Sequence, residues 1–359
     1  MTQLDDLPIR DDLRGKSAYG APQQRVPVAL NVNENTHPIP EDVAHDIVAR
    51  VAAAVIGLNR YPDREFTELR EALAGYLGHG LSAEQIWAAN GSNEVLQQIL
   101  QAFGGPGRSL LGFGPTYSMY RILADGTGTR WIEATRDEDY ELGPETALAA
   151  IREHDPDVVF LCSPNNPTGT PLSIETITAV ADAARGIVVV DEAYAEFAEP
   201  GTPSALTLLP GRPRLIVSRT MSKAFAFAGA RVGYLAADPA VTDALRLVRL
   251  PYHLSAITQA AALGALAHAP EMLATVGEIR LQRERIGVEL ARLGYRPYRS
   301  GSNFVLFGGV DDPQALFRAL LERGVLIRDI GLPGTMRVSA GTEAETTAFL
   351  EALAAIGGA

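Results

Sequence analysis

Four side chains with catalytic potential follow apolar stretches whose composition is typical of buried strands. Asp191 and Tyr194 follow one stretch, Lys223 follows a second and Asn166 follows a third. Ligands of open parallel sheets bind at the carboxyl ends of the strands. We therefore expect a carboxylate, a phenol, an amine and an amide to meet at one edge of a sheet.

Lysine is rare in this chain. Of 31 basic residues only Lys16 and Lys223 are lysines, and all the others are arginines. An imine with a carbonyl compound requires an amine, and a guanidinium cannot replace it. The position of Lys223 after a strand favours that role, whereas Lys16 has no such surroundings and could be present by chance.

Together these residue types suit a bound phosphorylated aromatic aldehyde, pyridoxal phosphate (PLP). Lys223 would form a covalent imine with its aldehyde. Asp191 would keep the pyridine nitrogen protonated, so that the ring accepts electrons. Asn166 and Tyr194 would hydrogen-bond the phenolate oxygen of the ring. Each residue alone also fits a structural role, such as a helix cap for Asp191 or a turn for Asn166 before its proline.

The phosphate of such a cofactor requires backbone N–H groups at the start of a helix. Gly91, Ser92 and Asn93 lie where a helix over residues 93–103 is expected to begin. Two hydroxyls and a cation follow the strand that leads to Lys223, and we assign them to the phosphate: Thr220, Ser222 and Arg231. Tyr117 is the candidate to stack on the pyridine ring, although a tyrosine of the core would have the same pattern.

Alternating helix and strand patterns indicate an α/β protein. Strand candidates occur at residues 109–113, 130–133, 158–162, 187–190, 215–218 and 232–236. Several of them are continuous apolar stretches, typical of strands that are covered on both faces. Helical periodicity separates several of them. We expect a mostly parallel, doubly wound sheet with helices on both sides. After residue 251 the pattern changes to long helices over 256–269 and 271–293 and then to short strands, which indicates a smaller α+β domain.

The 359 residues suggest about two domains at roughly 150 residues each. We expect an N-terminal arm over 1–28, the N-terminal part of the small domain over 29–45, the large PLP-binding domain over 46–252 and the small C-terminal domain over 253–359.

Composition excludes several other classes. The net charge of −12 argues against nucleic-acid binding. No apolar run approaches the roughly 20 residues of a membrane span, and the first residues lack the apolar core of a signal peptide, so we expect a cytoplasmic protein that acts on small molecules. The single cysteine, Cys162, allows no intrachain disulfide. The histidines lack metal-ligand spacing, so no metal is expected; His253 is the one that could line a substrate pocket.

Three motifs resemble those of the class I/II aminotransferases of PLP fold type I. They are Ser-Pro-Asn-Asn-Pro-Thr-Gly at 163–169, Asp-Glu-Ala-Tyr at 191–194 and the segment from Ser222 to Arg231. The resemblance covers nearly the whole chain. It implies a large domain with a mostly parallel seven-stranded sheet flanked by helices, a smaller α+β domain, and PLP-dependent amino transfer.

Within that family, several segments are similar to histidinol-phosphate aminotransferases of the actinobacterial type. These segments are residues 13–19, 30–35, 60–63, 87–94, 115–120 and 250–255. One departure is Thr36, where the family usually has a proline. We expect this change to loosen the N-terminal segment without removing activity.

The resemblance implies amino transfer between histidinol phosphate/imidazole acetol phosphate and glutamate/2-oxoglutarate, a step of histidine biosynthesis. It also implies a homodimer in which Tyr61 reaches the cofactor phosphate of the neighbouring subunit. Arg337 would bind the substrate anion, because a guanidinium pairs with both phosphate and carboxylate. Arg328 would be its partner, or else belong to a surface ion pair. Tyr19 and Asn33 would approach the substrate.

Three other functions remain open from the sequence. An aminotransferase for aromatic amino acids and a PLP-dependent threonine-phosphate decarboxylase would use the same fold and residues. A catalytically silent, PLP-binding regulator would require a DNA-binding extension, and the chain has no basic segment that fits one.

Overall fold

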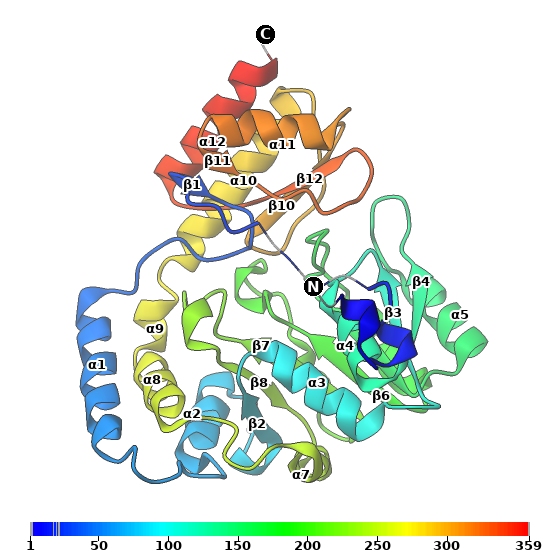
Figure 1. The fold of residues 1–359 in the computed structure, drawn as a ribbon, viewed down its shortest axis with the longest axis vertical. Coiled ribbons are helices and arrows are strands. Elements are labelled where there is room, and N and C mark those ends of the chain that lie inside the picture. Colours follow the sequence, from blue (N-terminus) through cyan, green and yellow to red (C-terminus); the bar gives the residue numbers. More distant parts are fainter. Residues whose placement is uncertain (1–2, 17, 19, 21, 358–359) are drawn as a thin grey trace.

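The computed structural model describes residues 3–16, 18, 20 and 22–357. A seven-stranded sheet lies at the centre of the larger of two units (Figure 1). Its strands lie in the order β2-β8-β7-β6-β5-β3-β4. Their bounds are β2 (Ile86–Ala89), β3 (Ser109–Gly114), β4 (Arg130–Thr135), β5 (Val158–Cys162), β6 (Ile187–Asp191), β7 (Leu215–Thr220) and β8 (Gly233–Ala236).

The sheet is parallel from β7 to β4, whereas β8 is antiparallel to both β7 and β2. The predicted fold class is confirmed. The apolar stretches indicated only six of the strands. The one they missed is β2, a four-residue strand, of which two residues are alanines. With only Ile86 β-branched, such a short segment does not stand out as a buried strand.

Helices cover both faces of this sheet, because parallel strands that are apolar on both sides must be covered on both sides. They are α1 (Glu41–Ile56), α2 (Thr67–Leu77), α3 (Ser92–Phe103), α4 (Met119–Thr127), α5 (Pro144–His154), α6 (Ile174–Ala183), α7 (Pro239–Val248), α8 (Ala256–Ala267) and α9 (Ala269–Met272). Short 3-10 helices complete the unit: η3 (Ala83–Gln85), η4 (Ala195–Phe197), η5 (Ala205–Leu208) and η6 (Ala228–Ala230).

The smaller unit has its own hydrophobic core. Its helices are α10 (Val276–Arg292), α11 (Pro313–Glu322) and α12 (Glu343–Gly357), and its strands are β1 (Val28–Ala29), β9 (Arg296–Pro297), β10 (Phe304–Gly308), β11 (Val325–Leu326) and β12 (Thr335–Ser339). Strand β10 pairs with β12 and β9, and β1 pairs with β11. The N-terminal segment therefore completes a unit that is otherwise built from the end of the chain.

The helix expected over 271–293 is interrupted. Helix α9 ends at Met272 and α10 begins at Val276. Leu273, between them, packs against the cores of both units, so the chain turns where it passes from one core to the other. Helix α8 packs on α1, and its buried residues belong to the larger core. The domain boundaries given above stay a prediction.

Thr36 does not loosen the N-terminal segment, contrary to our expectation. Its hydroxyl donates to Glu345 Oε2 at 2.5 Å and accepts from the Thr342 backbone N–H at 3.2 Å. A proline could make neither bond. The threonine thus joins the segment before α1 to the start of α12 in the smaller unit.

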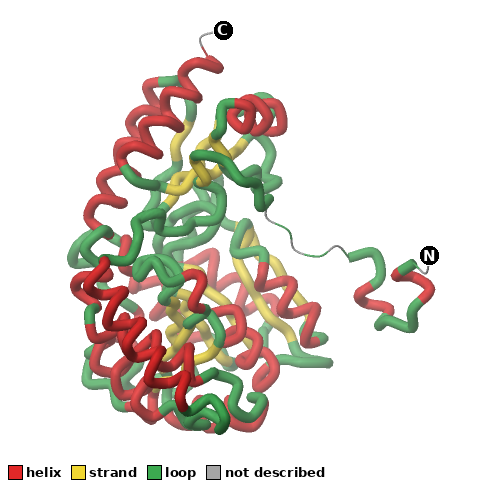
Figure 2. The backbone as a smooth tube through the Cα atoms, turned by 60° about the vertical axis from the view of Figure 1, so that its left-hand side comes forward, coloured by secondary structure: helices red, strands yellow, loops and turns green. Residues whose placement is uncertain are grey.

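Two short 3-10 helices near the N-terminus, η1 (Leu4–Asp6) and η2 (Asp11–Leu13), stand clear of the sheet (Figure 2). Arg10 bridges to the end of α4 by donating to the backbone oxygens of Asp125 and Gly126. Lys16 forms an ion pair with Asp125 at 2.6 Å. Within the described residues, no helix is both long and apolar enough to span a membrane.

Candidate active site

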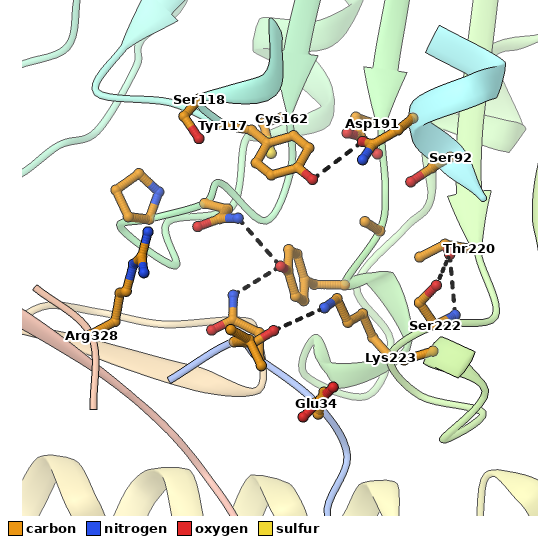
Figure 3. A pocket seen from close by; sticks show the side chains of 18 of the residues that line it. Glu34, Ser92, Tyr117, Ser118, Cys162, Asp191, Thr220, Ser222, Lys223 and Arg328 are labelled. Carbon is orange, nitrogen blue, oxygen red and sulfur yellow. Dashed lines mark hydrogen bonds between the residues drawn. The ribbon is translucent and has the colours of Figure 1, made fainter. Parts of the chain in front are cut away.

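A cavity of about 430 Å³ lies at the carboxyl ends of β5, β6 and β7, where the two units meet. The start of α3 and the loop before α4 contribute one wall, and residues 31–34, Arg328 and Arg337 contribute the other. Most of the side chains that we predicted for the site line this cavity (Figure 3). The topology of the sheet thus brings together residues that are far apart in the sequence.

Lys223 points into the cavity from the loop after β7. Its Nζ donates to the backbone oxygen of Val32 at 3.2 Å. Burial, and then the positive charge of Arg337, lower the pKa of Lys223 to about 8. A lowered pKa makes the neutral, nucleophilic amine accessible near neutral pH.

Asp191 ends β6 and is buried beneath the cavity. Tyr120 donates a hydrogen bond to its Oδ2 at 2.8 Å, and Ser218 donates to its Oδ1 at 3.1 Å. Burial raises the pKa of the carboxyl, and these two hydrogen bonds oppose the rise. A protonated ring nitrogen at this carboxylate would oppose it further, because an opposite charge lowers the pKa of an acid.

Tyr194 is buried, with its hydroxyl between two amides. Asn33 Nδ2 donates to it at 2.9 Å, and Asn166 Nδ2 donates at 3.4 Å. Burial raises the pKa of this phenol. Because the oxygen accepts both of these bonds, the hydroxyl proton remains available for donation to a ligand.

An anion cradle lies at the start of α3. Gly91 adopts φ +87°, and a Cβ at this position would lie 2.4 Å from Arg231 Nη2. A Cβ at Gly233 would lie 2.1 Å from the Ser92 backbone nitrogen. Glycines at both positions therefore let a guanidinium and a neighbouring strand approach the helix N-terminus, where N–H groups favour an anion.

The hydroxyls predicted for the same cradle also line the cavity. Thr220 Oγ1 lies 2.9 Å from Ser222 Oγ and donates to it. Ser92, Asn93 and Arg231 complete the lining at this end. This arrangement of N–H groups, hydroxyls and one cation fits the phosphate of PLP, so the residues present fit the group that the sequence implies.

Tyr117 lies across the cavity from Lys223, and its hydroxyl donates to Asn93 Oδ1 at 3.2 Å (Figure 3). It packs against the larger core yet still lines the cavity. Its packing agrees with a core tyrosine, and its stacking on a cofactor ring stays a prediction.

Two arginines enter the cavity from the smaller unit. Arg337 is buried, donates to Asn166 Oδ1 at 2.5 Å and to the Asn31 backbone oxygen at 3.1 Å, and lies over the ring of Phe304. Arg328 is partly exposed and pairs with Arg337 through backbone hydrogen bonds. Both arginines line the cavity and bring positive charge to it.

Two expected residues lie outside the cavity, and a third is not described. Tyr61 is 79% exposed and stacks on Tyr252 at 4.4 Å, outside the cavity. Tyr19 lies outside the described residues. His253 does not line the cavity, contrary to our hypothesis; it stacks on Trp87, and its Nε2 lies 2.9 Å from the Ala88 backbone oxygen.

Some cavity residues were missed by reasoning from residue types. Asn31 and Glu34 line the wall from the smaller unit, and Thr116 and Ser118 flank Tyr117. They belong to segments that we had used only to judge resemblance, and no strand leads into them. Cys162 also lines the cavity, but burial raises its pKa to about 12, which does not suit a nucleophile. No group of side chains in the described ranges could hold a metal ion.

Comparison with known proteins assigns the family. The family model "Aminotransferase class I and II" matches residues 25–353. The chain belongs to the class I and II aminotransferases. A histidinol-phosphate aminotransferase of Paenarthrobacter aurescens is 65% identical over 359 residues, which are 99% of this chain and 96% of the relative.

Solved aminotransferase structures share the fold. The histidinol-phosphate aminotransferase of Sinorhizobium meliloti, in complex with pyridoxal-5'-phosphate, is 28% identical with a TM-score of 0.82 and covers 93% of this chain and 92% of its own. The aspartate aminotransferase of Thermus thermophilus, with maleate, is 26% identical with a TM-score of 0.78 and covers 92% and 91%. Enzymes named for different substrates thus have this fold, so the fold alone does not select a substrate.

Proposed function

We propose that this aminotransferase transfers an amino group between histidinol phosphate and 2-oxoglutarate, with PLP bound covalently at Lys223. The observation that carries the proposal is the cavity itself. It places an amine, a buried carboxylate, an anion cradle and two arginines around one space. The 65% identity to a histidinol-phosphate aminotransferase supports the choice of substrate.

When bound, PLP supplies an aldehyde that takes up the amino group and a protonated ring that withdraws electrons from the substrate carbon. Asp191 holds the proton on the ring nitrogen, and Tyr120 and Ser218 orient that carboxylate. Asn166 and Tyr194 hydrogen-bond the ring hydroxyl, and Tyr117 stacks on the ring. Ser92, Ser222 and Arg231 hold the phosphate, together with the N–H groups of α3.

Lys223 moves the proton of the reaction. Once the substrate amine has displaced it, its neutral amine accepts the proton of the substrate Cα and later returns a proton, first as base and then as acid. The low pKa of this amine, set mainly by burial, suits both steps. Arg337 binds the anionic group of each substrate in turn, which is a phosphate in histidinol phosphate and a carboxylate in glutamate.

We also propose that the active unit is a homodimer in which Tyr61 reaches the neighbouring cofactor phosphate. The loops that follow α1 and α7 lie side by side through the stack of Tyr61 on Tyr252. The ends of the two helices and the loops after them expose large apolar side chains: Ile56 at 86%, Leu58 at 51%, Leu247 at 86% and Leu250 at 75%. Such a surface favours burial against a second copy. The expected cytoplasmic location stays a prediction.

An assay of the purified, PLP-loaded protein against a panel of amino donors tests the proposal. With 2-oxoglutarate as acceptor, histidinol phosphate should be the best donor, because it offers an amine together with a phosphate for the arginine pair. Phenylalanine tests the aromatic alternative, and carbon dioxide release from phosphothreonine tests the decarboxylase. Turnover of phenylalanine without turnover of histidinol phosphate would refute the proposal.

A further inference from the structure

The backbone around Glu34 is held in place on both sides. Asn33 adopts φ +58°, a left-handed conformation that is uncommon for a residue with a side chain. Its N–H donates to Ser339 Oγ at 3.0 Å, and its carbonyl accepts from Asn303 Nδ2 at 3.0 Å. On the other side, Asn35 Nδ2 donates to Thr275 Oγ1 at 3.1 Å. The position of Glu34 is therefore set by hydrogen bonds of its neighbours.

The carboxylate of Glu34, in contrast, forms no hydrogen bond or ion pair with the residues that the structure describes. It lines the cavity and remains exposed at its rim. Figure 3 shows it beside Lys223, on the side away from Asp191. Its negative charge opposes the effect of burial and of Arg337 on the pKa of Lys223. A fixed backbone thus presents to the ligand space a carboxylate that no described residue satisfies.

The remaining charge of this cavity is mostly positive. Arg231, Arg328 and Arg337 suit the phosphate or carboxylate groups of ligands, and Asp191 is buried with two donors of its own. Glu34 is the carboxylate of this lining that no described donor satisfies. It would repel the anionic groups of a substrate and attract an N–H donor or a cation. An imidazole ring is such a donor, and it can also be protonated near neutral pH.

We infer that Glu34 is a specificity-determining residue, whose carboxylate accepts a hydrogen bond from the ring N–H of the substrate imidazole. This inference rests on the proposed function, because it assumes histidinol phosphate as substrate. The arginines bind the phosphate of the same molecule. The cavity therefore recognises the phosphate end by positive charge and the imidazole end by the negative charge of Glu34. Glutamate has no ring, so its half-reaction does not use this contact.

Two donors that differ only in the ring test the inference. Histidinol phosphate and phenylalaninol phosphate are compared as donors for the wild type, for Glu34→Gln and for Glu322→Gln. The last variant removes one negative charge from an exposed position on α11 and is the control for long-range electrostatics. Calorimetry gives the Kd of both compounds for protein loaded with the amine form of PLP, where no amino transfer can follow.

Glu34→Gln should lower kcat/KM for histidinol phosphate, and raise its Kd, about 10-fold, which is typical for a hydrogen bond to a charged group. The values for phenylalaninol phosphate, and all those of Glu322→Gln, should stay near wild type. Equal losses with both rings, or no loss with either, would overturn the inference and leave the proposed function intact. A wild type that uses phenylalaninol phosphate but not histidinol phosphate would instead overturn both.

Discussion

Lys223 has a natural control within the same chain, because Lys16 is the only other lysine. Lys223→Ala should abolish amino transfer, since no other amine lines the cavity. Lys16→Ala should retain it, because Lys16 pairs with Asp125 instead. Borohydride reduction followed by peptide mass spectrometry should find the cofactor on the peptide of residue 223. Cofactor fixed at residue 16, or turnover by Lys223→Ala, would contradict the assignment.

Burial of Lys223 also predicts a pH dependence. With a pKa of about 8, the neutral fraction of the amine rises about tenfold per pH unit below 8 and levels off above it. The rate at which cofactor-free protein takes up PLP, followed by stopped-flow absorbance, should show the same profile. A rate that keeps rising towards pH 10 would mean that the amine has its ordinary pKa.

A variant of Tyr120 tests whether its hydrogen bond to Asp191 supports cofactor binding. Tyr120→Phe removes the donor to Asp191 Oδ2, so the carboxyl becomes easier to protonate and pairs less well with a ring nitrogen. We expect PLP to bind about 10-fold more weakly, as measured by fluorescence titration. Tyr234→Phe is the matched control, because that hydroxyl is equally buried and has no partner in the described part of the chain. Tyr234→Phe should leave the affinity for PLP near that of the wild type, and an equal loss in both variants would contradict this role of Tyr120.

At the scale of elements, the Thr36 contact makes the start of α12 depend on a residue about 300 positions earlier. Thr36→Val keeps the shape of the side chain but removes both hydrogen bonds, at a cost of about 1–2 kcal/mol. We expect the melting temperature to fall by about 2–4 °C in calorimetry. Thr202→Val, at an exposed position, is the control. An unchanged melting temperature of Thr36→Val would show that the contact does not stabilise the fold.

Long apolar strands and the residues directly after them could be predicted from the sequence. Strands β5, β6 and β7 are buried and mostly apolar in sequence. Their carboxyl ends could therefore be predicted, and with them the positions of Asn166, Asp191 and Lys223. The wall from the smaller unit could not be located in this way, because it depends on β1 pairing with β11 across almost the whole chain. The break before α10 was also hidden, since it results from packing on two cores rather than from a glycine or proline at that point.

At the scale of the whole molecule, we propose that the protein acts as a homodimer. Two variants that are each expected to be inactive can test this. Lys223→Ala lacks the amine, and Tyr61→Ala lacks the side chain offered to the neighbour. In a mixed dimer one of the two sites has both residues, so mixing the variants after mild dissociation should restore activity that neither has alone. If the mixture stays inactive while light scattering shows mixed dimers, Tyr61 does not act across the interface.

A variant at the proposed dimer interface tests which surface the two subunits bury. Leu247→Asp places a charge on an exposed leucine beside the loop of Tyr252. It should shift the molecular mass in light scattering from two chains to one and weaken cofactor binding, because burial of a charge at an interface is costly. Leu281→Asp, at a leucine of α10 that is 66% exposed, is the control and should leave the mass unchanged.

Between β1 and α12 the backbone passes from one core to the other at residues 30–41 and at residues 273–275. The hydrogen bond from Asn35 to Thr275 fastens these two passages to each other. The two chain passages between the units are therefore joined to each other at one side of the interface. A rotation of the smaller unit about this joint would leave all strand pairs intact, but it would have to break the hydrogen bond from Arg337 to Asn166.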